Sequence, residues 1–347
     1  MFDPEQVAQI AKKHKDSLRL VRKVEKTLNA RFFDMEESIR ALILAVVSGE
    51  PLLLIGPPGT AKSKLVRAFC EITGILHDPS DGRGSGEYGY FEYLLTPFTE
   101  PGELFGYFDI AKLNQGKDLE RKTDNMMQKA KIVYLDEVFN GSSAILNSIL
   151  TFLQERTFHD RGVIEKVAFE VLFGATNKIP EDPQLRAVFD RFVIRARVSN
   201  AASNHEIIGQ LLDDGWKETF GSRAPEVPIA KELFTGMKGF RRSMRQLPQR
   251  PKSNRDSHWD AFLRELTIAV AHTRQYDMSE MSNRRLIKIV YIMMIHRIYE
   301  AANDDNIETI LRLRTKELHL IPRYFLDDLD EQAVNQLHFR EIDASNS

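Results

Sequence analysis

The sequence predicts a parallel α/β sheet covered by helices on both faces, followed by an all-helical region. Up to about residue 200, short apolar runs alternate with amphipathic helical patterns, which is typical of parallel strands buried on both sides. After about Asn200 the strand patterns stop, while helical periodicity continues. We therefore expect a sheet domain over residues 1–200 and a helical domain over residues 201–347.

The composition is that of a soluble globular chain. Its 347 residues are 42% hydrophobic and 28% charged, and the formal net charge of -2 gives no general attraction to nucleic acid or anionic membranes. The single cysteine, Cys70, cannot form an internal disulfide and lies on an apolar helix face, so we expect a core residue in a reducing, cytoplasmic compartment. The N-terminal stretch has no signal-peptide core, and the longest apolar run, Ala41–Val47, is too short to cross a bilayer. We therefore expect no membrane insertion.

The expected elements follow in order. Residues 4–48 predict helices, the last of which ends at Gly49 as a C-cap, and residues 142–155 predict another with one apolar face. The apolar runs that predict strands are Leu52–Ile55, Tyr90–Leu95, Ile132–Leu135, Val167–Phe173 and Phe192–Arg197.

The second half contains three helical patterns, over residues 205–220, 259–277 and 282–304. Between the first two, Lys238–Arg255 carries seven basic residues, no acidic residue and two prolines. That composition favours a flexible basic loop.

The first strand runs into a glycine- and proline-rich loop and then a helix, in the segment LIGPPGTAKSKL. Such a turn aims backbone N–H groups and a helix dipole at one anion. Pro57 and Pro58 have no N–H group, so the donors are expected from Gly59 through Ser63. Lys62 would reach the β- and γ-phosphates of a nucleotide, and the Ser63 hydroxyl would ligate Mg²⁺.

One position departs from the usual Gly-x-x-x-x-Gly-Lys-[Ser/Thr] pattern, since Ala61 stands where the second glycine is expected. We expect Ala61 to have a negative φ, because a positive φ would cost a residue with a Cβ roughly 1–2 kcal/mol.

A second motif supplies the carboxylates that a metal-bound triphosphate needs. The apolar strand in KIVYLDEVFNG ends in Asp136 and Glu137. In a parallel sheet both would emerge at the same edge as the phosphate loop. Asp136 would hold Mg²⁺ through water and Glu137 would polarise the attacking water. Together the two motifs predict an NTPase.

Two weaker signals come next along the chain. A buried strand ends at Asn177, whose amide could hold the nucleophilic water between the γ-phosphate and Glu137. A short helix then leads to Phe-Asp-Arg-Phe, which puts Arg191, or as a second choice Arg186, on the domain surface.

The segment SEMSNRRLIKIV places two arginines in the first turn of a helix. Either Ser279 or Ser282 would cap it, and Arg284 and Arg285 would then oppose the helix dipole. A compensating anion is expected, either a nucleotide phosphate or a nearby glutamate.

These residues, in this order, resemble a AAA+ ATPase, and the segment between them narrows the resemblance. LLTPFTEPGELFGYFDIAKLNQG (residues 94–116), DEVFNGSSAILNSILTFLQERTFHDRG (136–162) and the stretch leading into the phosphate loop resemble the MoxR family, especially its RavA (regulatory ATPase variant A) branch. Residues 15–200 carry the resemblance, which then thins to residues 281–290. An alanine in the place of Ala61 is usual in that family.

The resemblance implies a AAA+ P-loop NTPase core, with a parallel five-stranded sheet, helices on both faces and β-hairpin inserts, followed by an all-α lid. It implies roles for Asp136 and Glu137 as Walker B, Asn177 as sensor 1, Arg191 as an arginine finger acting on a neighbouring subunit and Arg284 as sensor 2. The implied Walker A residues are Gly56, Pro57, Pro58, Gly59, Thr60, Ala61, Lys62 and Ser63, with Lys64 beside them.

Two inserted hairpins are implied as well, around Phe105–Lys117 and over residues 155–169. In the family such loops face the pore of a ring, and Tyr107, Phe158 and His159 are the expected contact residues. RavA carries a further β-rich domain after its lid, for which the roughly fifty residues after Arg297 are too few.

The favoured hypothesis is an ATP- and Mg²⁺-dependent ring, expected to be a hexamer, that remodels a protein client beside a protein with a von Willebrand factor A domain. A second hypothesis is a DNA-acting ring motor, favoured only by residues 238–255. A third is an assembly scaffold gated by nucleotide, in which hydrolysis is incidental.

Overall fold

The structure is a computed structural model. It describes residues 2–76, 89–110, 121–160, 163–167, 169–200, 208–209, 212, 229–247, 257–328 and 334–342. The helical pattern predicted over residues 205–220 lies almost wholly outside the described residues, as do residues 111–120 of the first predicted insert and residues 248–256 of the predicted basic loop.

Five parallel strands form the central sheet, in the order β2-β3-β6-β1-β7. They are β1 (Leu52–Ile55), β2 (Tyr90–Leu94), β3 (Ile132–Asp136), β6 (Val171–Thr176) and β7 (Ile194–Arg197). All five strands confirm apolar runs identified in the sequence, although β6 and β7 begin some residues later than expected. A separate hairpin consists of β4 (Thr157–Asp160) and β5 (Val163–Lys166).

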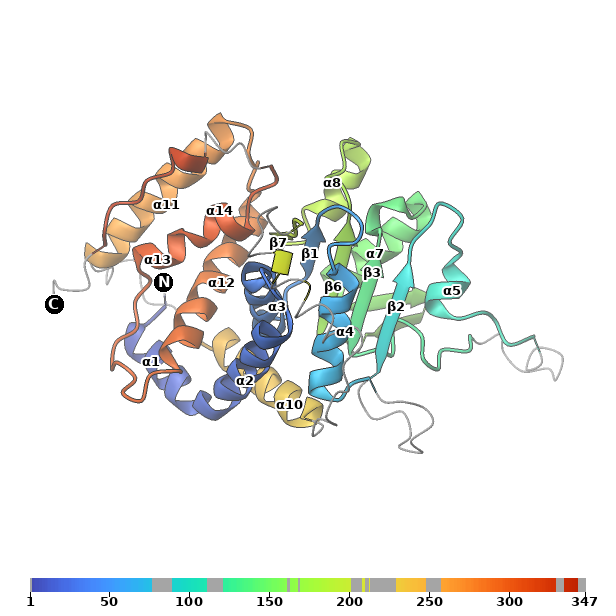
Figure 1. Ribbon diagram of the computed structural model, residues 1–347, viewed down its shortest axis with the longest axis horizontal. Helices are drawn as coiled ribbons and strands as arrows, with labels where there is room; N and C mark the ends of the chain where they lie inside the picture. Colours follow the sequence, from blue (N-terminus) through green and yellow to red (C-terminus); the bar gives the residue numbers. More distant parts are fainter. Residues whose placement is uncertain are drawn as a thin grey trace.

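Helices cover the sheet on both sides and extend beyond one edge of it (Figure 1). They are α1 (Pro4–Lys13), α2 (Lys15–Arg31), α3 (Glu36–Ser48), α4 (Lys62–Thr73), α5 (Pro101–Phe105), α7 (Ser143–Glu155), α8 (Pro183–Phe189), α10 (Ala230–Arg245), α11 (Ser257–Gln275), α12 (Asn283–Ala301), α13 (Thr315–Leu318) and α14 (Leu320–Tyr324), with a 3₁₀ turn, η2 (Val138–Asn140).

Successive residues of the inner strands β1, β3 and β6 pack into two different cores, as expected for a sheet covered on both faces. Leu52 and Leu54 of β1 join the core formed with α2, α3, α4 and α12. Leu53 and Ile55 join the core formed with α7 and α8. The inner strands therefore have no solvent-facing side, which explains why they are almost continuously apolar, whereas the edge strands β2 and β7 carry exposed residues such as Leu94 and Arg197.

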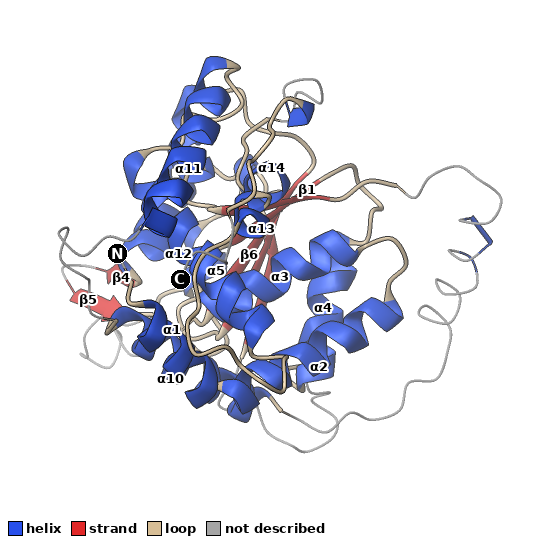
Figure 2. Ribbon diagram, turned by 90° about the vertical axis from the view of Figure 1, so that its left-hand side faces the viewer, coloured by secondary structure: helices blue, strands red, loops and turns tan. Residues whose placement is uncertain are grey.

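The N-terminal helices pack on the C-terminal helices as well as on the sheet. α1 packs on α12, and α2 packs on α10, so the two ends of the chain build one helical mass beside β7. Figure 2 looks onto this side, with α11 to α14 in front of the sheet. Helix α3 ends at Gly49, whose φ of 71° confirms the predicted C-cap.

The prediction of a flexible basic loop is wrong for the residues of that segment that the structure describes. Residues 238–245 belong to α10, whose apolar face buries Phe234, Met237, Phe240 and Met244. Arg241 lies on the same face and forms a buried ion pair with Glu170, while its guanidinium also donates to the carbonyl oxygen of Val46 at 3.0 Å. Residues 238–245 of the charge run are therefore part of an amphipathic helix with one arginine turned inward.

This burial predicts that two neighbouring arginines differ sharply in their effect on stability. Arg241→Ala leaves the Glu170 carboxylate buried without its partner and should lower the free energy of unfolding by about 3 kcal/mol. The matched variant Arg242→Ala removes an exposed side chain and should change it by less than about 0.5 kcal/mol. Urea denaturation of both variants checks this, and equal losses would contradict the buried pair.

Candidate functional site

The phosphate loop joins β1 to α4 at the carboxyl edge of the sheet. Gly59 has a φ of 84° and open space around its missing side chain, and the Thr60 hydroxyl closes the turn by donating to the Pro57 carbonyl at 2.8 Å. No side chain caps the start of α4. The first N–H groups of that helix therefore point toward the loop without an intrahelical acceptor, which is the arrangement that binds an anion.

Gly56 is required by packing rather than by the phosphate itself. A Cβ at this position would lie 1.9 Å from the Val198 carbonyl oxygen, because the end of β7 passes directly against the start of the loop. The same contact is fixed by the Val198 N–H, which donates to the Ile55 carbonyl at 2.8 Å. The edge strand and the phosphate loop are thus locked together.

The expected backbone conformation of Ala61 is wrong. Its φ is 62° and its ψ is 20°, in the left-handed region, where the loop turns into α4. An alanine accepts this conformation at a cost of roughly 1–2 kcal/mol, which a glycine would avoid. The position therefore has the geometry that explains why the usual pattern has glycine there.

Lys62 brings three separate segments of the chain together. Its ammonium donates to the carbonyl oxygens of Gly56 at 2.5 Å and Pro57 at 2.9 Å, and to Oδ1 of Asn177 at 3.1 Å. Burial lowers the pKa of Lys62, and the nearby carboxylates of Asp136 and Glu137 oppose that shift. The predicted lysine, both acids and the predicted amide thus converge on one point.

The two acids lie where the sequence predicted, at the carboxyl end of β3. Asp136 is the last residue of β3, and its Oδ1 accepts the N–H of Glu137 at 3.0 Å. Glu137 has a φ of 47°, an unusual backbone conformation for a side chain of its size.

Asn177 follows β6, which pairs with β3 on one side and β1 on the other. The turn after it is held by the Thr176 hydroxyl, which donates to the Lys178 carbonyl at 2.8 Å. Because β6 lies between the strand of the phosphate loop and the strand of the acids, its end is the only strand end flanked by both motifs among the described strands.

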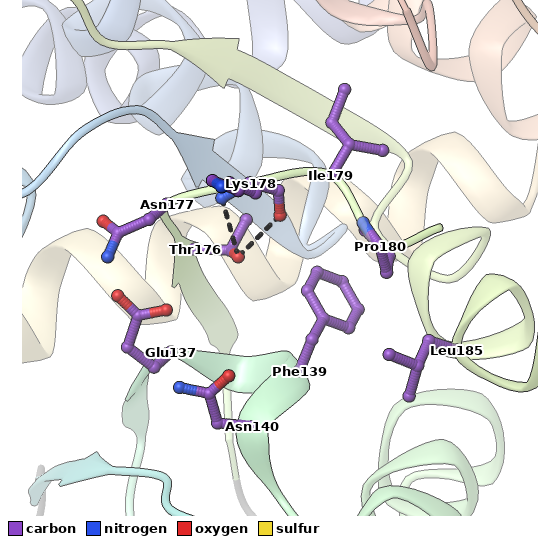
Figure 3. A pocket seen from close by; sticks show the side chains of 9 residues that line it. All are labelled: Glu137, Phe139, Asn140, Thr176, Asn177, Lys178, Ile179, Pro180 and Leu185. Carbon is purple, nitrogen blue, oxygen red and sulfur yellow. Dashed lines mark hydrogen bonds between the residues drawn. The ribbon is translucent and has the colours of Figure 1, made fainter. Parts of the chain in front are cut away.

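A pocket of about 470 Å³ opens beside this point. Figure 3 shows Glu137 and Asn177 on one side of it and apolar side chains on the other. The apolar lining residues are Phe139, Ile179, Pro180 and Leu185. None of these residues was predicted from the sequence, although Phe139 follows the acids of the second motif by two residues, and Ile179 and Pro180 follow Asn177 within three.

Arg191 lies in the turn between α8 and β7, half-buried rather than fully on the surface. Its guanidinium donates to Oδ2 of Asp190 at 3.2 Å. Burial lowers the pKa of Arg191, and the positive charge of Arg284 lowers it further. The second choice, Arg186, is exposed and lies 3.8 Å from a carboxylate oxygen of Glu280.

The two arginines at the start of α12 have different environments. Ser282, not Ser279, caps the helix, since its Oγ accepts the Arg285 N–H at 3.3 Å. Arg285 is buried and paired with the carboxylate of Asp327, so a carboxylate provides the compensating anion for this residue, from an aspartate rather than a glutamate. Arg284 is exposed, close to Arg191, and forms no ion pair with any described residue.

The predicted second hairpin is confirmed as β4 and β5, paired antiparallel. Phe158 stacks on Phe105 with ring centroids 4.5 Å apart, so it joins this hairpin to the described part of the first insert. The ion pair between Arg121 and Asp160, at 3.2 Å, adds a second link. Tyr107 and His159 are exposed, as a contact role would require.

The single cysteine is buried in the core, as predicted, and burial raises the pKa of its thiol. Among the helices of the described part of the chain, none is both long and apolar enough to span a bilayer.

The left-handed backbone at residue 61 predicts opposite effects for two substitutions. Ala61→Gly removes the steric cost and should raise the free energy of unfolding by about 0.5–1 kcal/mol, while Ala61→Val should lower it by at least about 1 kcal/mol. Thermal and urea unfolding of the three proteins decides this. A glycine variant less stable than the parent chain would contradict the assigned backbone conformation.

Comparison with known proteins shows the family to which the chain belongs. A family model described as the MoxR domain in the MoxR-vWA-beta-propeller ternary systems matches residues 19–234. Two uncharacterized proteins of Methanocaldococcus jannaschii, MJ0812 and MJ0079, are both 35% identical, over 194 and 196 residues, and each match covers 56% of this chain and 48% of the relative. ORF618, named a structural protein of Acidianus two-tailed virus, is 27% identical over 210 residues, which cover 60% of this chain and 32% of that protein.

The chain thus spans less than half the length of these curated relatives. A crystal structure of a protein from Cytophaga hutchinsonii, described as a candidate ATPase, superposes with a TM-score of 0.60 over 95% of both chains at 12% identity, which shows a shared fold. Because the family model covers more than half of the sequence, including every strand of the central sheet, the chain belongs to the MoxR family of AAA+ ATPases.

Proposed function

We propose that this chain is a Mg²⁺-dependent ATPase that assembles into a ring and remodels a protein client or complex. The observation that carries the proposal is the position of the Lys62 ammonium, bonded to the phosphate loop and to Asn177 at once, with Asp136 and Glu137 beside it. A cation held at a helix N-terminus next to two acids fits a magnesium triphosphate.

The donor set suits Mg²⁺, which prefers oxygen ligands and keeps several waters. The Ser63 hydroxyl, in the first turn of α4, and the Asp136 carboxylate, at the end of β3, would hold it. When bound, the ion neutralises charge on the phosphate oxygens.

The protein groups then divide the remaining tasks. Lys62 and the N–H groups that start α4 bind the phosphates of ATP. Glu137 accepts the proton of the attacking water, and the Asn177 amide orients that water toward the γ-phosphate. The apolar half of the pocket limits how many other waters approach the same point.

The position of Arg191 supports the proposal of a ring. Ile194 of β7 pairs with Leu52, at the start of β1, so Arg191 precedes the amino end of β7, whereas the phosphate loop follows the carboxyl end of β1. A strand of this length separates the two by about 13 Å at roughly 3.3 Å per residue. Arg191 therefore suits the γ-phosphate of a neighbouring copy better than its own, and Arg284 lies close to Arg191. The ring that we propose is a hexamer.

Two observations support the proposal that the ring acts on a protein client: the two inserts and the match to the family model. The hairpin of β4 and β5 and the segment from Phe105 to Ile110 lie together through the Phe105–Phe158 stack, with Tyr107 and His159 exposed. The matching family model describes MoxR domains of systems that also contain a vWA protein, so we propose a partner with a von Willebrand factor A domain. A cytoplasmic location is part of the proposal, and membership of the RavA branch stays a prediction.

The DNA-motor hypothesis is weakened in its main support. Its evidence was the basic run, but Arg241 is buried in an ion pair and residues 238–245 form a packed helix. The scaffold hypothesis uses the same site without needing turnover, so it is separated from ours by a variant that binds ATP and does not hydrolyse it.

Glu137→Gln is that variant. It keeps the size and hydrogen bonding of the side chain but cannot accept a proton, so kcat for ATP hydrolysis should fall by at least about 10²-fold. ATP affinity, measured by equilibrium dialysis, should be retained. If ATP-bound rings of this variant support the cellular function at the parent level, the remodelling proposal is wrong.

A mixing experiment tests the action of Arg191 on the neighbouring site. Arg191→Ala alone should lower kcat by about 10³-fold. Lys62→Ala alone should be inactive because it binds no ATP, although its own Arg191 is intact. Rings mixed from the two should regain hydrolysis, since a Lys62→Ala subunit supplies the arginine to its neighbour. Activity that never exceeds the sum of the two separate proteins would contradict a ring with shared sites.

A further inference from the structure

Three charged side chains, two buried arginines and a half-buried aspartate, meet where α12 and the segment after α14 contact β7. Arg195 and Arg285 are 3% and 1% exposed, and both donate to Oδ1 of Asp327, which also accepts the Ser279 hydroxyl at 3.0 Å. Two buried guanidinium groups can lie this close only because one carboxylate lies between them. Burial by itself would raise the pKa of Asp327, but the two arginines hold it below its usual range.

Arg195 has a second set of contacts, with the turn that carries Arg191. Its Nε donates to the carbonyl oxygen of Phe192 at 3.1 Å and its Nη2 to that of Phe189 at 2.9 Å. Its guanidinium also lies on the Phe189 ring, 3.7 Å from the ring centroid. The backbone is therefore fixed on both sides of Arg191 by one side chain, whose orientation depends on Asp327.

The same turn is joined to α12 at another point. The Ser282 hydroxyl, at the cap of α12, donates to Oδ2 of Asp190 at 3.2 Å, and this oxygen also accepts from Arg191. Asp327 itself is held to the start of this region, since its N–H donates to the Met278 carbonyl at 2.8 Å. A shift of α12 would thus move the turn with it.

We propose that Asp327 is a positioning residue for Arg191: through Arg195 and Arg285 it fixes the turn Phe189–Phe192 to the helical region, so that the position of that region sets the reach of Arg191 into the neighbouring site. The inference rests on the proposed function. It goes beyond the family match, because Arg285 and Asp327 both lie after residue 234, where that match ends.

The size of the effect follows from geometry. A catalytic group displaced by about 1 Å can cost on the order of 10²-fold in rate. Asp327→Asn leaves an oxygen in place but removes the charge that holds both arginines. In assembled rings, kcat should fall by about 10²-fold, whereas KM for ATP should change by less than about threefold, because the phosphate loop is untouched.

The matched control is the next residue, Asp328. It is 77% exposed and lies 3.6 Å from Arg197, so Asp328→Asn removes the same charge without touching the buried cluster. Its kcat should stay within about twofold of the parent chain, as for an exposed ion pair.

Mixing separates positioning from simple loss of structure. Asp327→Asn subunits mixed with Lys62→Ala subunits should regain hydrolysis, because the intact Arg191 of the Lys62→Ala chain serves the phosphate loop of its Asp327→Asn neighbour. A subunit that is merely misfolded would not be rescued. Arg195→Lys is the second variant if Asp327→Asn does not assemble. It keeps a cation near Asp327 but cannot donate to the carbonyl oxygens of both Phe189 and Phe192. Its kcat should fall about tenfold, and mixing with Lys62→Ala subunits should rescue it in the same way.

Three results are decisive. Loss of kcat with rescue supports the inference. Parent-level kcat in Asp327→Asn or Arg195→Lys rings, while Arg191→Ala is impaired and rescued, overturns the inference and leaves the proposed function standing. Parent-level kcat in Arg191→Ala rings overturns the proposed shared site and this inference with it.

Discussion

The structure depends on one cation held where three strands end. The Lys62 ammonium donates to two carbonyl oxygens of its own loop and to Oδ1 of Asn177, and the carboxylates of Asp136 and Glu137 favour its charged form. This is possible because β6 lies between β1 and β3, so that the loop, the amide and the acids leave the sheet at one edge. Burial disfavours the charged lysine, and such a site is ready to exchange carbonyl oxygens for phosphate oxygens.

The helical region is tied to the sheet by buried ion pairs rather than by apolar contact alone. Arg241 pairs with Glu170 just before β6, and Arg195 of β7 shares Asp327 with Arg285 of α12. Apolar faces can slide past one another at small cost, but a buried charge separated from its partner is expensive. The helices therefore have a fixed position on β7, and the residue after this strand, Val198, packs directly against the phosphate loop at Gly56.

Much of this could be predicted from the sequence, because strand ends carry short-range signals. The apolar runs Leu52–Ile55, Ile132–Leu135 and Val167–Phe173 predicted strands of the sheet, and the polar residues that follow them predicted the site. Long-range pairs left no such signal: Arg195 and Asp327 are far apart in the chain. The prediction of a basic loop was wrong because it rested on the charge of the segment. The helical spacing of Phe234, Met237 and Met244 indicates a helix and could have been recognised. At Ala61 the residue type argued against the positive φ that the turn requires.

The central claim is that the Lys62 site binds a magnesium triphosphate, and isothermal titration of the purified chain tests it most directly. ATP added in the presence of Mg²⁺ should release or absorb heat with one site per chain, and Lys62→Ala should abolish that signal while unfolding at the same denaturant concentration as the parent. No saturable heat with the parent chain, or equal affinity in the Lys62→Ala variant, would contradict the account.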